Sequence, residues 1–251
     1  MTVAPEPDRL LALLWRAHAP AARRRGPIPS RSVDELVHAG TELSDRDGLQ
    51  ALTVRALAHR VGMAPMSVYT HVPDKDALVV LMVDAVLAEL PIGPWGRLDW
   101  RARVRAVADA HRQLLAVHPW LAEAEALNRP SLGPGGLAAY EWELGAFLPV
   151  GLDDLETDHA RTLVLSFVRA HARSVRAGDR AAAESGMDDA QWWAANGPFL
   201  ALMADPEHYP LATRIGSAAG AAQGSAYDSH RAYEFGLTRI LAGLSGDDRS
   251  G

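Results

Sequence analysis

The sequence predicts an all-α protein. Apolar residues recur at helical spacing along most of the chain, no stretch alternates apolar and polar residues long enough for a strand, and Pro/Gly-rich breakers separate the helical segments. With 251 residues, 48% of them hydrophobic, the chain is long enough to bury a sizeable core in one large domain or two smaller ones.

Composition excludes several classes of protein. The absence of cysteine rules out disulfides, Cys-ligated zinc and thiol nucleophiles. The apolar run at 10–15 follows Glu6 and Asp8 rather than a basic region, and no run reaches transmembrane length, so we expect a cytoplasmic protein without membrane association. The net charge of −6 hides an asymmetry, because residues 1–75 sum to +2 and the remainder to −8.

The first two expected helices can be placed from residues that favour the start or the end of a helix. Residues 9–18 fit a short extra helix, and the following linker carries Arg23 to Arg25, either a solvated cluster or an arm for the minor groove. Apolar residues at i, i+3, i+4 and i+7 predict a helix over 32–43 that stops at "SDRDG".

Three further helices follow closely. Thr53 is a suitable N-cap and Gly62 a suitable stop for a helix over 54–61. Pro65 fits only a first helical turn, so the next helix begins there and ends near His71, before the Val-Pro pair. Asp74 caps a fourth helix, whose apolar residues cover more than one face and predict burial on two sides.

The Pro/Gly-rich stretch at 91–96 predicts the boundary between two modules. Further helices are expected near 99–117, 119–127, 135–148, 153–177, 188–203, 207–219 and 228–244. The predicted domains are an N-terminal extension with a basic arm (1–30), a small three-helix module (31–93), a larger helical domain (94–245) and a disordered tail (246–251).

Two short helices joined by a Gly-containing turn predict a helix-turn-helix, whose second helix enters the DNA major groove. On that helix, "APMSVYTH" at 64–71, Val68 faces the buried seam while small and polar groups look outward. The alternative is a surface helical hairpin that only packs. The longer string "GLQALTVRALAHRVGMAPMSVYTHVPDKDAL" at 48–78 resembles the DNA-binding module of the tetracycline-repressor (TetR) family of bacterial regulators, with Met63 and Val68 as apolar departures from its pattern.

The resemblance implies which residues meet DNA. Those near base edges are Arg55, Pro65, Met66 and Thr70. Those that hold phosphates are Thr53, Ser67, Tyr69, His71 and Lys75, the only lysine in the chain. Three alternatives stay open: a structural capping role for His71, packing for Met66 and simple solvation for Arg55.

The segments 100–123 and 233–244 are similar, more weakly, to the tetracycline-repressor-type C-terminal domain, which binds an effector and forms a dimer. Stripes on two helices then predict a homodimer interface of Leu163, Phe167, Tyr233, Leu237, Ile240 and Leu241, although such stripes also cover a chain's own core.

Aromatic and polar groups of the middle helices predict the ligand pocket. The candidates are Trp100, His111, Trp142, Phe147, His171, Trp192 and Trp193, which suit a small planar or apolar effector. Each aromatic could instead belong to the core, and His111 and His118, seven residues apart on one face, could be surface or satisfied core histidines. We expect no metal and no cofactor.

Together these features predict a dimeric transcriptional repressor that an effector releases from a near-palindromic DNA operator. Two alternatives remain: a ligand-independent regulator controlled by a protein partner, and a helical enzyme using groups such as Asp158 and His159. The enzyme alternative is weak, because the chain has no Gly-x-Ser-x-Gly elbow, no phosphate-cradling loop and no His-Glu-x-x-His motif.

Overall fold

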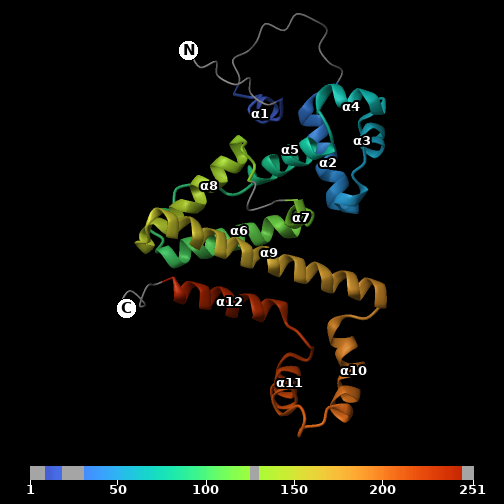
Figure 1. Cartoon of the computed structure of the whole chain (residues 1–251), viewed down its shortest axis with the longest axis vertical. Helices are drawn as coiled ribbons and strands as arrows, with labels where there is room; N and C mark the ends of the chain where they lie inside the picture. Colours follow the sequence, from blue (N-terminus) through green and yellow to red (C-terminus); the bar gives the residue numbers. More distant parts are fainter. Residues whose placement is uncertain (1–8, 19–30, 125–129, 245–251) are drawn as a thin grey trace, which may run out of the picture. The chain divides into compact units, whose positions relative to one another are not determined.

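The computed structural model describes residues 9–18, 31–124 and 130–244 and contains only helices within them (Figure 1). The chain forms two compact units, residues 1–165 and 166–251, and the long helix α9 (Asp154–Ser185) belongs partly to each. The predicted all-α class is confirmed. None of the described helices has both the length and the apolar character needed to cross a bilayer.

The first unit begins with five α-helices and a short 3-10 turn. They are α1 (Arg9–Leu14), α2 (Val33–Asp47), η1 (Leu49–Ala51), α3 (Val54–Val61), α4 (Pro65–His71) and α5 (Lys75–Leu87). The predicted caps are confirmed: the Thr53 side chain accepts from the Ala56 N–H, the Asp74 side chain accepts from the Ala77 N–H, and Gly62 ends α3 with φ of 67°.

Helix α5 forms the centre of this unit. It packs against α2, α8, α1 and α7, and its buried residues include Leu78, Leu81, Met82 and Val86. Because apolar residues lie on all sides of the helix, exposing any one side to solvent would lower the stability of the fold. The predicted burial on two sides is confirmed.

The rest of the first unit is α6 (Trp100–Val117), α7 (Leu121–Ala124), α8 (Pro134–Phe147), the 3-10 turn η2 (Leu148–Val150) and the first part of α9. Helix α8 begins directly against α5. The buried carboxylate of Asp84 accepts hydrogen bonds from the Gly135 and Gly136 N–H groups at 3.3 and 2.8 Å and from the Ser131 hydroxyl at 3.0 Å. A side chain of α5 thus satisfies the free N–H groups at the start of α8.

The second unit contains the end of α9, α10 (Asp189–Met203), α11 (Pro210–Gln223) and α12 (Ser229–Gly243). Tyr233 of α12 lies against two rings of α9, with centroid distances of 5.6 Å to Phe167 and 4.8 Å to His171. A Cβ atom at Gly236 would meet the Phe167 ring at about 2.5 Å, so the glycine permits this approach of the two helices.

Several helix ends differ from the sequence prediction. Helix α2 runs through "SDRD" to Asp47, because nothing in that stretch prevents a helix before Gly48, which adopts φ of 80°. Helix α9 continues through Gly178 to Ser185, because Gly178 does not adopt positive φ and so does not end the helix; Gly186, with φ of 70°, ends it. Helix α11 starts at Pro210 rather than near 207, since residues 205–209 form a turn in which Asp205 accepts from His208.

Some predicted features lie outside the described residues. These are the basic cluster Arg23 to Arg25, the end of the helix expected over 119–127, and the tail 246–251.

We predict that Gly135→Ala destabilises the fold, because the new Cβ atom would overlap the backbone carbonyl oxygen of Asp84. Backbone groups cannot rotate away as a side chain can, so we expect a loss of about 1–3 kcal/mol in the free energy of unfolding. The matched control is Gly216→Ala in α11, where a Cβ atom meets nothing within 4 Å. Urea unfolding of both variants measures this, and equal stability of the two would contradict it.

Candidate nucleic-acid interface

Helices α3 and α4 form the predicted helix-turn-helix. The turn is closed by the N–H of Gly62, which donates to the His59 carbonyl at 3.2 Å, and by the N–H of Met63, which donates to the Ala58 carbonyl at 2.9 Å. Pro65 then occupies the first turn of α4, where its missing N–H costs nothing. Val68 is 2% exposed and faces the core, as expected.

The opposite face of α4 is open to solvent. Met66 is 75% exposed and Tyr69 41%, which is unusual for such large apolar side chains. Of the nine residues predicted to meet DNA, the exposed ones are Thr53, Arg55, Pro65, Met66, Tyr69 and Thr70, and the half-buried ones are Ser67, His71 and Lys75.

Some of these polar groups are already bonded within the chain. The Thr70 hydroxyl donates to the Ser67 carbonyl at 2.7 Å. Both ring nitrogens of His71 lie 3.0 Å from carbonyl oxygens, Nδ1 from that of Ser67 and Nε2 from that of Arg31. His71 therefore has the structural role that the sequence left open, because its ring joins the end of α4 to the residue before the N-cap of α2.

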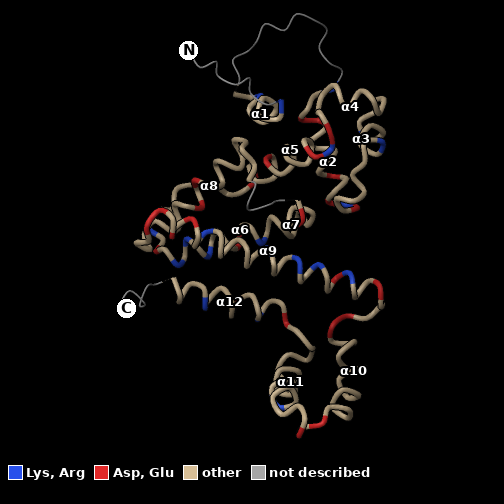
Figure 2. Tube along the Cα trace, in the orientation of Figure 1, with Lys and Arg blue, Asp and Glu red and all other residues tan. Residues whose placement is uncertain are grey.

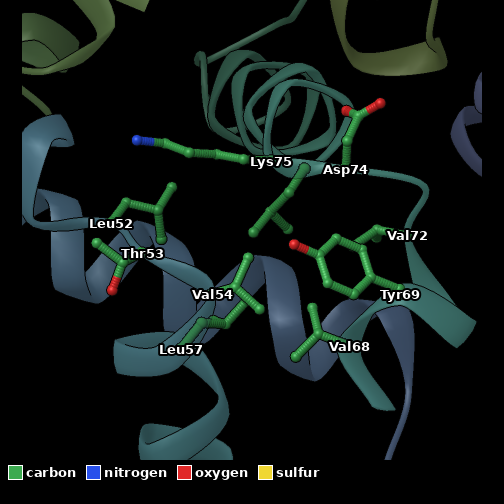
Figure 3. Close-up of a pocket in the computed structure, with 10 residues that line it drawn as sticks. Leu52, Thr53, Val54, Leu57, Val68, Tyr69, Val72, Asp74 and Lys75 are labelled. Carbon is green, nitrogen blue, oxygen red and sulfur yellow. The ribbon is translucent and has the colours of Figure 1, made fainter. Parts of the chain in front are cut away.

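Lys75 and Tyr69 lie at the rim of a small hollow between α3, α4 and the start of α5 (Figure 3). In this view the Lys75 ammonium extends away from Asp74 and over Leu52, while the Tyr69 hydroxyl points into the hollow. The Lys75 Nζ lies 3.5 Å from the Leu49 carbonyl, a long contact that the cation can exchange for a stronger anionic partner.

A buried charged cluster lies between α6, α8 and α9. One oxygen of the Glu143 carboxylate lies 2.6 Å from His111 Nε2, and the other accepts from Arg161 Nε at 2.5 Å. Burial raises the pKa of Glu143, but the hydrogen bonds and charges of His111 and Arg161 lower it, and the net pKa is below its usual value. Neither Glu143 nor Arg161 was a predicted site residue, although a lone acid inside the apolar run "WELGAF" was a visible signal.

His118 joins three segments. Its Nδ1 lies 2.8 Å from Asp45 of α2, its Nε2 lies 3.1 Å from Glu89 after α5, and Trp120 Nε1 donates to the same Asp45 carboxylate at 2.7 Å. Both ring nitrogens of His118 therefore face carboxylate oxygens, and the ring joins the end of α6 to α2 and to the residues after α5. His111 and His118 are therefore both buried histidines with carboxylate partners.

The predicted ligand residues are divided between the two compact units. In the first unit, Trp142 is buried and stacked on Trp95 at 4.8 Å, Phe147 is fully buried, and Trp100 is half-buried with Arg101 over its ring. His171 belongs to the second unit. Trp193 lines an open groove of about 710 Å³ between α10 and α11, together with Tyr209 and small residues, whereas Trp192 is 45% exposed.

The predicted dimer residues fall into two groups. Tyr233, Leu237 and Leu241 are buried within the single chain. Leu163 is 50% exposed, and Phe167 and Ile240 are half-buried. Among the described residues, no group of three or more His, Asp or Glu side chains has an arrangement that could hold a metal ion.

Two family models match the chain, in the same order as its expected modules. Residues 36–82 match the model of bacterial regulatory proteins of the tetR family, and residues 94–247 match the tetracyclin repressor-like C-terminal domain. The HTH-type transcriptional repressor DrrR1 of Streptomyces coeruleorubidus is 35% identical over 240 residues, covering 94% of this chain and 84% of that protein.

Solved structures agree with these matches. ActR, a TetR family protein of Streptomyces coelicolor, was solved in complex with (S)-DNPA, and that structure gives a TM-score of 0.69 at 27% identity over 86% of this chain and 98% of the other. The structure of ActR in complex with actinorhodin gives a TM-score of 0.71 at 26% identity and covers 88% of this chain and 100% of that chain. The chain therefore belongs to the TetR family of bacterial transcriptional regulators, which are DNA-binding proteins and not enzymes.

Proposed function

We propose that this regulator is a homodimeric repressor that binds a near-palindromic operator in the bacterial cytoplasm and is released by a small planar or apolar effector. The observation that carries the proposal is the exposed outer face of α4, where Met66, Tyr69 and Thr70 look outward while Val68 anchors the helix. Two such helices, about 34–36 Å apart in a dimer, would read successive major grooves.

The proposed contacts divide by chemistry. Arg55, Pro65, Met66 and Thr70 meet base edges, since guanidinium, hydroxyl and apolar groups discriminate bases and thymine methyls. The groups that meet phosphates are Thr53, Ser67, Tyr69 and Lys75, whereas His71, with both ring nitrogens at carbonyl oxygens of the chain, holds α4 in place. For Lys75 the support is its position in the first turn of α5, where helix N–H groups and the helix dipole favour an anion, and the length of its 3.5 Å contact with the Leu49 carbonyl.

We predict that Lys75→Ala weakens binding by a similar factor for all DNA sequences and lowers the slope of log affinity against log salt by about one unit, as expected for one lost phosphate contact. Met66→Ala should instead change the preferred bases, by about 1–3 kcal/mol at the affected position, and leave the slope unchanged. The probe is a fragment selected by the protein from genomic DNA, which should contain two symmetric half-sites. A Lys75→Ala slope equal to that of wild type would exclude the phosphate contact.

Homodimerisation is supported by apolar surface that one chain leaves open. Helices α10 and α11 carry few charges (Figure 2). Their exposed large apolar residues are Trp192, Phe199, Leu200, Leu202, Met203, Leu211 and Ile215. Helices that are apolar on all sides are buried in an assembly. Leu163, Phe167 and Ile240 remain accessible on α9 and α12, whereas the buried Tyr233, Leu237 and Leu241 would support the interface from beneath.

We predict that Leu163→Glu gives a monomer that binds the operator fragment weakly, because a charge on the interface lacks a partner and the two half-sites are then bound independently. The control is Leu148→Glu, an equally apolar residue that is 67% exposed on η2. Sedimentation of both variants and of wild type is the measurement. A Leu163→Glu protein that stays dimeric would remove Leu163 from the interface.

The effector proposal rests on the aromatic residues of the C-terminal domain and on the ActR complexes. Trp100, His111, Trp142, Phe147, His171, Trp192 and Trp193 remain the candidate contacts, and large flat side chains suit a planar ligand. The solved complexes of ActR contain actinorhodin or (S)-DNPA, which makes these two compounds the first to test.

We predict that actinorhodin or (S)-DNPA releases the protein from its selected DNA fragment, and that Trp142→Phe raises the concentration needed for release without changing DNA affinity. The largest loss of DNA affinity that the ligand can cause equals the ratio of its affinities for the DNA-releasing and the DNA-binding conformations of the protein. Fluorescence anisotropy of labelled DNA measures it. If neither compound acts on a protein that binds DNA normally, the regulator controlled by a protein partner becomes the better candidate.

A further inference from the structure

The short helix α1 has no part in the function described so far, yet it contacts the recognition helix directly. Arg9 Nη2 lies 3.2 Å from the carbonyl oxygens of both Tyr69 and Thr70, in the last turn of α4. We propose that α1, together with the turn at 15–18 that follows it, is a positioning element for operator binding, which caps the recognition helix through Arg9 and joins it to the C-terminal domain through Trp15. The proposal deepens, and rests on, the proposed operator binding through α4.

The Tyr69 carbonyl lacks its normal helical donor. In an α-helix this oxygen would accept from the N–H four residues later, but that residue is Pro73, which has no N–H. The helical hydrogen bond one residue earlier is present, since the Val72 N–H donates to the Val68 carbonyl at 3.1 Å. The Arg9 guanidinium therefore supplies the donor that proline removes, and its positive charge is favourable at the negative end of the helix.

Helix α1 is held in place by other contacts, so Arg9 does not depend on its own hydrogen bonds alone. Leu14 is 4% exposed, and α1 packs against α5. Arg16 forms an ion pair with Asp34 in the first turn of α2. The buried Leu14 of α1 and the ion pair of Arg16 in the following turn together hold the segment in place, so Arg9 is positioned against α4.

The turn that follows α1 contacts the C-terminal domain. Trp15 Nε1 donates to the Leu132 carbonyl at 2.8 Å, in the segment just before α8. The neighbouring Ser131 hydroxyl donates to Asp84, which also binds the first N–H groups of α8. Helix α1 thus connects the end of the recognition helix to the segment preceding α8, in addition to the covalent path through α5.

The first test is Arg9→Ala in the full chain, assayed on the selected DNA fragment and on single-base variants of it. We expect an affinity loss of about fivefold by the same factor for every fragment, from the lost charged hydrogen bonds at the helix end. Arg9→Lys should recover part of the loss, because one ammonium can still reach a carbonyl. The control is Arg46→Ala, which removes another exposed arginine whose partner is the adjacent Asp47.

The salt dependence separates positioning from direct DNA contact. If Arg9 acts through α4, the slope of log affinity against log salt keeps its wild-type value in Arg9→Ala. A slope lower by about one unit would mean that Arg9 binds a phosphate, and it would overturn the proposal. Wild-type protein that binds no fragment would refute operator binding itself, whereas normal binding by both wild type and Arg9→Ala would refute only the role of α1.

Hydrogen exchange without DNA provides the second test. Arg9→Ala should speed exchange of the Val72 amide at the end of α4 and leave the Ala56 amide at the start of α3 unchanged. Trp15→Phe keeps an aromatic ring but loses the N–H donor, so it should speed exchange in α1 and lower DNA affinity in the same uniform way. Arg9→Ala and Trp15→Phe losses should then be non-additive, because both act through the docking of α1. Unchanged α4 exchange in Arg9→Ala, or additive losses, would contradict the proposal.

Discussion

The arrangement of the first unit depends on one buried carboxylate, Asp84. It lies on α5, the helix that also packs against α2 of the DNA-binding module, and it binds the first backbone N–H groups of α8 in the C-terminal domain. Two glycines allow the α8 backbone to approach closely enough, since a Cβ atom at Gly133 or Gly135 would overlap Asp84. The same hydrogen bonds give the buried carboxylate its donors and the first N–H groups of α8 their acceptor. Removing the carboxylate would therefore leave buried N–H groups without a hydrogen-bond partner.

Other carboxylates join elements in the same way. Glu143 connects α6 to α9 through His111 and Arg161, and Asp45 connects α2 to the end of α6 through His118 and Trp120. Each contact crosses between helices that are distant in sequence. The Asp45 contacts join the DNA-binding module to the C-terminal domain, whereas the Glu143 contacts lie within the C-terminal domain.

Local features were predictable because their causes are local. The caps at Thr53 and Asp74, the left-handed Gly62 and the first-turn Pro65 depend on residues within four positions along the chain. The inward position of Val68 and the burial of α5 on several sides followed from helical periodicity. Helix ends were less accurate at Asp47 and Ser185: the polar residues before Gly48 do not stop α2, and α9 passes through Gly178, because a glycine ends a helix only where it adopts a non-helical conformation.

The sequence by itself determined the all-α class, the helix-turn-helix and the family, because a motif of some thirty residues has fixed spacing and local steric requirements. Only the tertiary structure decided the partners of Asp84, Glu143 and His118, the docking of Arg9 on α4, and the burial of Tyr233 and Leu237 in a single chain. Among the hydrogen bonds of these groups, the one between His118 and Asp45 joins residues 73 positions apart. Neither residue type nor helical periodicity specifies which charged groups meet across helices, because that depends on how the helices pack in three dimensions.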